Sequence, residues 1–411
     1  MLKQFTAIRN TGKNEFRFVK YIIEGNIFTM GKIAIIGASY LQLPLIETAK
    51  KMGLETHVFA WEAGDPGEAA ADYFYPISII EKEKILQNCQ EIKIDGICSI
   101  ASDLAAITVN YVAANMGLTG NSLDSTYCST NKHAMRKCFF EHGDPSPRSM
   151  TIMSLSDLKG ETLQYPLIVK PSDRSGSRGV TKLDDSAGLE NAIEKARSQS
   201  FEKKVLIEEF AEGREYSVEC ISWDGEHHLL AVTKKYTTGA PHFIETAHLE
   251  PALLSQDILS RVRDITFHAL DSLQIKNGAS HTELKIADDG SIKLIEVGGR
   301  MGGDCIGSDL VKLSTGIDFV QEIIKVSLGQ KPALKAVANC AVAAVRFICT
   351  REDLFVLEQI KKENPQFIVR EEIHPLSSNQ ITDSSSRHGY YLLRSEKVQD
   401  IMKYLPREKS Q

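Results

Sequence analysis

From Lys32 onward, short apolar runs alternate with longer stretches in which apolar residues recur every three or four positions. The short runs have the length of buried strands and stand at 32–38, 55–61 and 94–101. The longer stretches have the period of helices and stand at 43–53 and 103–117. Strand, helix and strand in this order predict an open parallel sheet, whose ligands bind at the carboxyl ends of the strands. We therefore expect a pocket beside Gly37 to Tyr40 and beside Ser102 and Asp103.

The turn after the first strand does not have the spacing of a dinucleotide-binding loop. GASYLQ (37–42) is not GxGxxG, and the second strand ends in Trp61 rather than in an acidic residue. A nicotinamide-dependent dehydrogenase is therefore disfavoured. A plain tight turn and a small-molecule site are both compatible with GASYLQ.

The pattern changes after GDPSPR (143–148), a linker with two prolines. Beyond it, the sequence predicts strands around a polar loop, two helices and a series of antiparallel strands, at 165–183, 186–198, 204–236, 255–273 and 281–300. From about residue 330 it predicts a third unit, with strands and helices at 341–349, 352–365 and 385–395 and a last amphipathic helix. A chain of 411 residues is too long for one ordinary core, which agrees with two or three units.

Composition and charge exclude several classes of protein. The formal net charge is −6 and no Lys/Arg-rich stripe appears, so no nucleic-acid partner is expected. The longest apolar stretch near the C-terminus is broken by Arg346 and is too short for a membrane span. Eight cysteines without a CxxC pair favour inert thiols in a reduced, cytoplasmic compartment. Residues 1–29 have no signal-peptide core and Met30 reads like a natural start, so we interpret 1–29 as an extension or a mis-called start.

The sequence predicts a close pair of carboxylates, Glu283 and Glu296. ADDGS (287–291) contains Asp-Gly, the commonest signal of a two-residue hairpin turn. If Asp289 and Gly290 form that turn, Glu283 lies opposite Glu296 on an antiparallel ladder, with Cα atoms roughly 4.5–5.5 Å apart. Two acids that close require a positive charge between them, and Mg²⁺ commonly binds carboxylates together with phosphate oxygens. A different register, or two solvated edge residues, is the alternative.

The residues after Glu296, VGGRMGGD, surround Arg300 with four glycines. Bare backbone of this kind lets a ligand approach closely and exposes amide donors. The guanidinium offers a fork suited to phosphate or carboxylate oxygens. Together, an acid for a metal and an arginine for an anion predict a site for a phosphorylated intermediate. The glycines are Gly298, Gly299, Gly302 and Gly303.

In this order, the motifs resemble those of the ATP-grasp enzymes and, within them, the carboxylate–amine ligases, particularly the L-amino-acid ligase (dipeptide-forming) branch. The resemblance covers roughly residues 31–395. It implies an α/β chain with the α+β ATP-grasp fold. The implied units are a Rossmann-like domain over 30–121, a two-lobed ATP-grasp domain over 122–329 with its small lobe at about 148–212, and a small C-terminal lobe over 330–411.

The resemblance also implies which residues bind ATP. Lys132 in STNKHAMRK and Lys170 in YPLIVKP match two lysines that contact the phosphates. In VLIEEFAEGREYSVE, Glu208 matches an acid beside the adenine amino group, and Glu215 matches the acid that binds the ribose hydroxyls. The other expected contacts belong to the glycine-rich loop, which folds over the phosphates, and to the hinge: Ser175, Gly176, Ser177, Glu209, Phe210 and Ala211.

By the same resemblance, Glu283 and Glu296 match the magnesium-binding acids, so ATP and one or two Mg²⁺ ions, replaceable by Mn²⁺, are the expected cofactors. His281 and Arg300 match groups that hold the phosphate or the oxyanion, with a purely structural role as the alternative for His281. Many family members carry an asparagine where this chain has Gly298, which removes one ligand of a second metal. Substrate contacts are expected from Ser102, Asp103, Lys235, Glu245, His248 and Asp304, with Cys305 shaping the pocket.

The implied reaction activates a carboxylate as an acyl phosphate and couples it to an amine, such as that of an amino acid, with release of ADP and phosphate. The expected partners are these small-molecule substrates and a second copy in a homodimer. A purine-biosynthesis-like or carbamoyl-phosphate-like ATP-grasp enzyme is one alternative. A module that binds ATP without catalysis is another.

Overall fold

The computed structural model describes residues 21–23, 26–28, 30–174, 178–239, 243–335, 341–376, 381 and 383–407. Most of the suspected extension at 1–29 lies outside these ranges. A short antiparallel hairpin of β1 (Tyr21–Ile23) and β2 (Asn26–Phe28) is described within it. No helix in the described ranges is long and apolar enough to cross a membrane.

The first unit is built on a parallel sheet, as predicted. Its strands lie in the order β5 (Tyr73–Pro76), β4 (Glu55–Ala60), β3 (Lys32–Ile36) and β6 (Gly96–Cys98). Its helices are α1 (Leu43–Lys51), α2 (Pro66–Ala70), α3 (Lys82–Ile92) and α4 (Asp103–Met116). Alternate residues of β3 pack into separate hydrophobic clusters on the two faces, which explains its unbroken apolar run. The strand that the pattern did not predict is β5, an edge strand whose Tyr73 is 42% exposed.

The second sheet is small and antiparallel. Its strands lie in the order β7 (Ser149–Ile152), β10 (Val205–Glu209), β8 (Leu167–Pro171) and β9 (Thr181–Leu183). The 3₁₀ turn η1 (Leu155–Leu158) follows β7, and α7 (Leu189–Gln199) packs its apolar face against β8 and β10. All four strands fall within the range expected for the small lobe.

The third sheet has eight antiparallel strands. They lie in the order β15 (Ile292–Gly298), β14 (Gly278–Ile286), β11 (Arg214–Trp223), β12 (Glu226–Thr237), β13 (Glu245–Glu250), β16 (Val342–Phe347), β18 (Gly389–Ser395) and β17 (Ile368–Ile373). Because β16 pairs with β13, this large sheet continues across residue 330, where the sequence suggested a new unit. The later strands still pack into a hydrophobic cluster of their own with Leu357, Tyr391 and Leu393.

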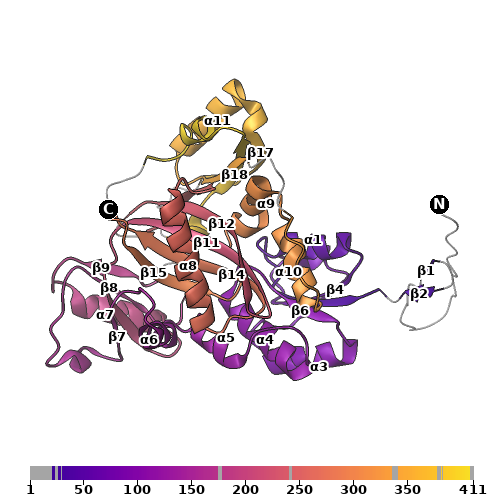
Figure 1. The fold of residues 1–411 in the computed structure, drawn as a ribbon, viewed down its shortest axis with the longest axis horizontal. Helices are drawn as coiled ribbons and strands as arrows, with labels where there is room; N and C mark the ends of the chain where they lie inside the picture. The colour runs from indigo at the N-terminus through magenta and orange to yellow at the C-terminus, as the bar shows by residue number, and fades with distance from the viewer. Residues whose placement is uncertain are drawn as a thin grey trace.

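Helices flank the large sheet and join it to the other two. Figure 1 shows α8 lying across the sheet beside β14 and β15, the small sheet to one side and the parallel sheet to the other. The elements outside the first two units are α5 (Leu123–Thr130), α6 (Lys132–His142), α8 (Gln256–Ser272), the π turn η2 (Ile306–Leu310), α9 (Val311–Thr315), α10 (Phe319–Ser327), α11 (Arg351–Glu363), the 3₁₀ turns η3 (Pro365–Phe367) and η4 (Ser384–Ser386), and α12 (Val398–Met402).

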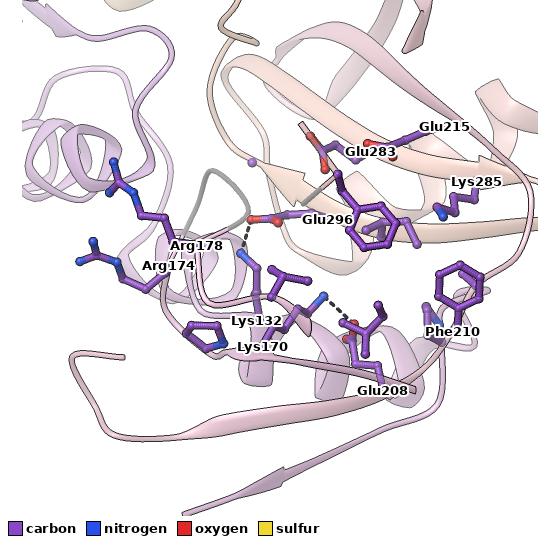
Figure 2. Close-up of a pocket in the computed structure, with 18 of the residues that line it drawn as sticks. Lys132, Lys170, Arg174, Arg178, Glu208, Phe210, Glu215, Glu283, Lys285 and Glu296 are labelled. Carbon is purple, nitrogen blue, oxygen red and sulfur yellow. Dashed lines mark hydrogen bonds and ion pairs between the residues drawn. The ribbon is translucent and has the colours of Figure 1, made fainter. Parts of the chain in front are cut away.

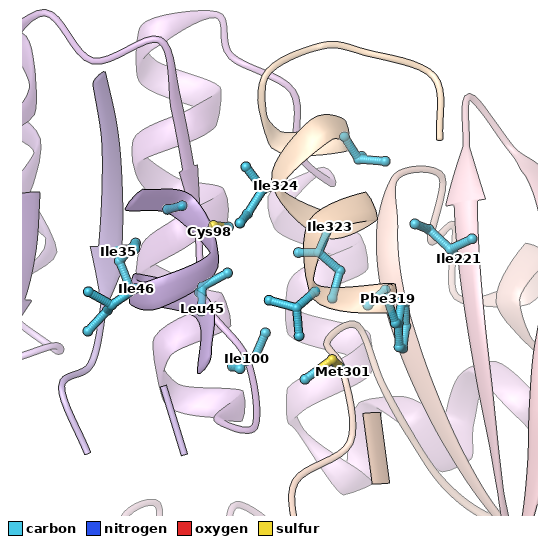
Figure 3. Packing of buried hydrophobic residues seen from close by; sticks show 14 of the residues in the cluster. Ile35, Leu45, Ile46, Cys98, Ile100, Ile221, Met301, Phe319, Ile323 and Ile324 are labelled. Atoms are coloured by element: carbon cyan, nitrogen blue, oxygen red, sulfur yellow. The ribbon is translucent and has the colours of Figure 1, made fainter. Parts of the chain in front are cut away.

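Helix α10 holds the parallel sheet against the large sheet. Figure 3 shows Ile323 and Ile324 of this helix between Leu45 of α1 and Ile221 of β11, and these residues belong to one buried cluster. Phe319, at the start of α10, is only 1% exposed. The two sheets therefore share a continuous apolar core, which fixes the parallel sheet against the elements that carry the candidate site.

We expect Phe319→Ala to lower the free energy of unfolding by about 3–5 kcal/mol, because it removes a buried ring and leaves a cavity in this core. Urea unfolding followed by circular dichroism measures the change. Phe140→Ala is the matched control, since Phe140 is 87% exposed, and it should change stability by no more than about 0.5 kcal/mol. Equal effects of the two substitutions would show that α10 does not join the sheets.

Candidate active site

A cavity of about 190 Å³ opens between the small sheet and the large sheet, and Figure 2 shows side chains from both sheets around it. It brings together many residues that the sequence predicted: Lys132, Lys170, Glu208, Glu209, Phe210, Ala211, Glu215, Glu245, His281, Glu283, Glu296, Gly298 and Arg300. It is also lined by residues that were not predicted, among them Arg174, Arg178 and Lys285. The predicted Ser175, Gly176 and Ser177 lie outside the described residues.

Glu283 and Glu296 face each other on β14 and β15, as predicted, although the turn that joins the strands differs. The hairpin loop is one residue longer than the predicted Asp-Gly turn, since Ile286 pairs with Ile292. The longer loop shifts the register by one residue, and a β-bulge at Ile295 shifts it back. The predicted pairing is therefore correct because two departures from the predicted hairpin cancel.

Lys132 is the first residue of α6, and its ammonium lies 2.6 Å from Glu296 Oε1 (Figure 2). The helix begins here because the Asn131 side chain accepts hydrogen bonds from N–H groups of its first turn. The Lys132 N–H group donates to Ser172 O at 2.8 Å, which ties the helix start to the loop after β8. The start of α6 thus holds a buried ammonium against one acid of the pair.

Glu208 shares its carboxylate between two cations. Lys170 Nζ lies 2.5 Å from Glu208 Oε2, and Arg136 Nε donates to Oε1 at 2.6 Å. Burial alone would raise the pKa of Glu208, but Arg136 and Lys170 outweigh burial and hold that pKa below its usual value. Glu208 was expected to lie beside the adenine amino group of ATP. In the structure, both of its carboxylate oxygens instead bind cations of the protein. Glu208 thereby positions Lys170, which also lines the cavity.

Arg136 is a site residue that the sequence reasoning missed. Besides Glu208, its Nη2 donates to the carbonyl oxygen of Ile295, the bulged residue, at 2.7 Å. The arginine therefore links the small sheet to the bulge that sets the carboxylate pair. Arg136 follows Lys132 by four residues and therefore lies on the same face of α6. This spacing was the sequence signal that could have identified it as a site residue.

Lys235 lies behind the cavity wall, in contact with three carboxylates. Its Nζ is 2.8 Å from Glu283 Oε1, 3.2 Å from Glu215 Oε1 and 3.5 Å from Glu245 Oε1. Burial opposes the charge, but these acids, with Glu283 first, raise the pKa of Lys235 well above its usual value. In turn Lys235 outweighs burial and holds the pKa of Glu283 well below its usual value. Lys235 is thus a partner of the acids and not a residue of the cavity lining.

His281 connects Glu283 to a buried acid that the sequence reasoning missed. Its Nδ1 contacts Glu219, and its Nε2 lies 3.5 Å from Glu283 Oε1. Burial would lower the pKa of His281, but Glu219 outweighs burial and raises it. The other oxygen of Glu219 accepts a hydrogen bond from Gly302 N–H at 3.0 Å. An acid inside the apolar run SVEC was the available signal for Glu219.

Arg300 binds Asp103 at the carboxyl edge of the parallel sheet. Arg300 Nε donates to Asp103 Oδ1 at 2.8 Å, and Nη2 donates to Oδ2 at 3.3 Å. A Cβ at Gly298 would lie 3.0 Å from Asp103 Oδ1, and one at Gly302 would lie 2.5 Å from Glu219 Oε1. At both positions, glycine therefore leaves room for an internal ion pair, whereas the sequence reasoning explained these glycines by the approach of a ligand alone.

At the other end of the cavity, Phe210 lies between two lysines. Lys182 Nζ is 4.2 Å and Lys285 Nζ is 4.7 Å from the centre of its ring. Burial lowers the pKa of Lys285. Phe210 and Ala211 line this end together with Glu215, so an apolar surface meets an acid here, as expected for the base and ribose of a nucleotide.

The structure separates some predicted substrate residues from the cavity. The Ser102 hydroxyl caps α4, and Asp304 accepts a hydrogen bond from Arg387 at 2.7 Å. Burial, and then Lys235, lower the pKa of His248 to about 3, so this histidine is neutral. Residues that were predicted as contacts and are not among the lining residues are Gly37 to Tyr40, Ser102, Asp103, Lys235, His248, Asp304 and Cys305.

The side chains present fit a divalent cation that is bound largely by phosphate and water. Glu283 and Glu296 supply two carboxylates on one face, and each is held by a lysine ammonium. Among the described residues, no group of three or more Asp, Glu, His or Cys side chains is arranged to hold a metal ion. Mg²⁺ commonly takes one or two carboxylates together with substrate phosphates, which agrees with this set.

Fold, cavity and paired acids agree with what the resemblance to the ATP-grasp enzymes implies. Residues 163–309 match the ATP-grasp domain family. The chain therefore contains an ATP-grasp domain and its relatives are ATP-dependent ligases, in agreement with the ATP-grasp carboxylate–amine ligase family that the motifs suggested.

Individual relatives and solved structures include ligases that join amino acids or similar compounds. Alanine–anticapsin ligase of Bacillus subtilis (strain 168) is 26% identical over 326 residues, which are 70% of this chain and 68% of that protein. The crystal structure of an L-amino acid ligase from Bacillus licheniformis superposes with a TM-score of 0.79 at 25% identity, covering 91% of this chain and 96% of that one. Phosphoribosylglycinamide synthetase from Anaerococcus prevotii has a TM-score of 0.72 at 17% identity over 91% of this chain and 96% of its own, which shows the fold alone.

We expect Glu208→Ala to lower the free energy of unfolding by about 3–5 kcal/mol, because it leaves the buried cations of Lys170 and Arg136 without their shared acid. Differential scanning calorimetry gives the change. Glu194→Ala removes an acid of an exposed pair with Arg197 and should cost no more than about 0.5 kcal/mol. An equally small loss from Glu208→Ala would contradict the positioning role of Glu208.

Proposed function

We propose that this protein activates a substrate carboxylate as an acyl phosphate with ATP and then joins it to an amine, with release of ADP and phosphate. One observation carries the proposal. The facing acids Glu283 and Glu296, two lysines and Arg300 all border one cavity that also offers an apolar end for a base. Acids for a metal, cations for phosphate and a site for an oxyanion are the parts that phosphoryl transfer to a carboxylate requires.

In the first step, a carboxylate oxygen of the substrate attacks the γ-phosphorus of ATP, and the bond to the β-bridging oxygen breaks to release ADP. Lys132 and Lys170 neutralise phosphate oxygens, and Glu208 and Arg136 keep Lys170 in place. Phe210 and Ala211 contact the base, and Glu215 accepts from the ribose hydroxyls. When bound by Glu283 and Glu296, Mg²⁺ would neutralise charge on the phosphates.

In the second step, the amine attacks the acyl carbon, the bond between the acyl carbon and the phosphate oxygen breaks, and inorganic phosphate leaves with the proton that the amine loses. Arg300 stabilises the oxyanion of the tetrahedral intermediate, and Asp103 orients its guanidinium. His281 lies beside Glu283 and is held by Glu219, so it presents a fixed N–H group to the same region. The site must exclude water during both steps, because water would hydrolyse the acyl phosphate.

We further propose that both substrates are amino acids or closely similar compounds. Support comes from the similarity to an alanine–anticapsin ligase and to an L-amino acid ligase. Glu245 lines the cavity next to Glu283 and suits the ammonium group of such a substrate. The domain division into a Rossmann-like unit, two ATP-grasp lobes and a C-terminal lobe also belongs to this proposal.

We expect ADP to form from MgATP only when a suitable amino acid or small carboxylate is supplied. Glu296→Ala should reduce the rate at least about 100-fold, because it removes one of the two acids proposed to bind the metal that neutralises the phosphates. A coupled assay of ADP release against substrate pools measures this. Glu141→Ala, which changes an acid that is 54% exposed on α6, should leave the rate unchanged. Tight MgATP binding without turnover in any pool would point to an ATP-binding module instead.

Transfer of an oxygen atom tests the acyl phosphate separately. With a substrate whose carboxylate carries ¹⁸O, one labelled oxygen should appear in the released phosphate, because the carboxylate oxygen bonds to the γ-phosphorus and stays with it. Mass spectrometry of the phosphate detects the label. Unlabelled phosphate alongside product formation would exclude an acyl phosphate and leave the ligase class intact.

A further inference from the structure

One buried lysine faces three carboxylates that the proposed function assigns to three different ligands. Glu283 is assigned to the metal, Glu215 to the ribose and Glu245 to the substrate. The Lys235 side chain is 4% exposed, whereas these acids are 27%, 18% and 18% exposed. The acids reach the cavity, and the ammonium lies behind them.

The fold delivers these four groups from four neighbouring strands. Lys235 is on β12, between β11 with Glu215 and β13 with Glu245, and Glu283 is on β14, the next strand beyond β11. The hydrogen-bonded sheet fixes their spacing, so the cluster does not depend on a flexible loop. A single positive charge at its centre leaves the four groups with a net charge of −2.

A cluster of three acids without Lys235 would attract a divalent cation from solution. Hard cations with oxygen ligands bind sites that gather several carboxylates. With the ammonium present, a dication near Glu283 is repelled at close range, in surroundings where charges are poorly screened. In the structure as it stands, with Lys235 among the acids, the described residues hold no group of three or more His, Cys, Asp or Glu side chains that could bind a metal ion.

We propose that Lys235 is the internal counter-ion of the metal site and keeps free divalent cations off Glu283, so that the metal enters together with the nucleotide. The inference rests on the proposed role of Glu283 as a metal-binding acid. The nucleotide supplies the phosphate charge that the metal requires, and its ribose engages Glu215. Lys235 then retains Glu245, the acid on the substrate side. Lys235 is therefore a positioning residue and not a catalytic one.

Binding of free Mn²⁺ to the full chain, without nucleotide or substrate, tests the proposal. Electron paramagnetic resonance measures free and bound Mn²⁺ directly, and a thermal melt reports the metal-dependent shift in Tm. We expect weak binding to the unaltered protein and binding at least about tenfold tighter to Lys235→Met, with a Tm that rises when Mn²⁺ is added. Lys235→Arg keeps the charge and should bind as weakly as the unaltered protein. Unchanged affinity in Lys235→Met would overturn the proposal.

Two further variants separate the cluster from general charge effects. Lys331→Met removes an exposed ammonium that pairs with Glu226, away from the three acids, and it should not change Mn²⁺ binding. Lys132→Met frees only Glu296 and should give a smaller gain than Lys235→Met. A gain as large as that of Lys235→Met in either variant would refute the cluster as the cause.

The test remains decisive if Lys235→Met does not fold. The double variant Lys235→Gln/Glu245→Gln removes one charge of each sign and leaves two acids without their ammonium. It should again bind Mn²⁺ more tightly than the unaltered protein, and unchanged binding would overturn the proposal. Because no nucleotide or substrate is present, a negative result concerns Lys235 alone, whereas failure of ADP formation concerns the proposed reaction.

Discussion

The pairing of two carboxylates across β14 and β15 is the constraint on which the arrangement of the active site depends. Two such charges about 5 Å apart repel by roughly 3 kcal/mol at an effective dielectric constant of 20. The fold balances them with ammonium groups from two separate elements, Lys132 at the start of α6 and Lys235 within β12. The position of α6 and the strand order of the large sheet therefore determine the charge balance of the site as well as the packing.

A second ion pair explains the glycine at position 298. The Arg300–Asp103 pair passes so close to residue 298 that any Cβ there would touch it. An asparagine at this position would require the pair to shift, because its Cβ would lie 3.0 Å from Asp103 Oδ1. Gly298 thus leaves room for an acid from the parallel sheet, which gives the N-terminal unit a direct contact with the arginine proposed to stabilise the oxyanion.

Much of the fold and of the candidate site could be predicted from the sequence, because the sequence signals for these features are local. Buried parallel strands have continuous apolar runs. The carboxylate pair was predicted from a two-residue turn, and the pairing is correct only because the longer loop and the bulge at Ile295 cancel, which the sequence did not reveal. Arg136 and Glu219 were missed because their importance lies in partners 72 and 62 residues away. A lone acid or base in an apolar element has the same appearance whether it faces solvent or a distant partner.

Lys235 illustrates what the sequence alone does not reveal about the site. Alternation along β12 gives the face on which a side chain lies, but only the strand order reveals that three acids from other strands share that face. Three further charges of the cavity lining are also paired within the protein: Lys170 with Glu208, Arg300 with Asp103, and His281 with Glu219. Ligand binding at such a site exchanges partners instead of filling bare charges. In the proposed reaction, specificity depends on which ligand replaces the internal partners at the least cost. A nucleotide that brings its own metal would replace both lysine contacts of the acid pair at once.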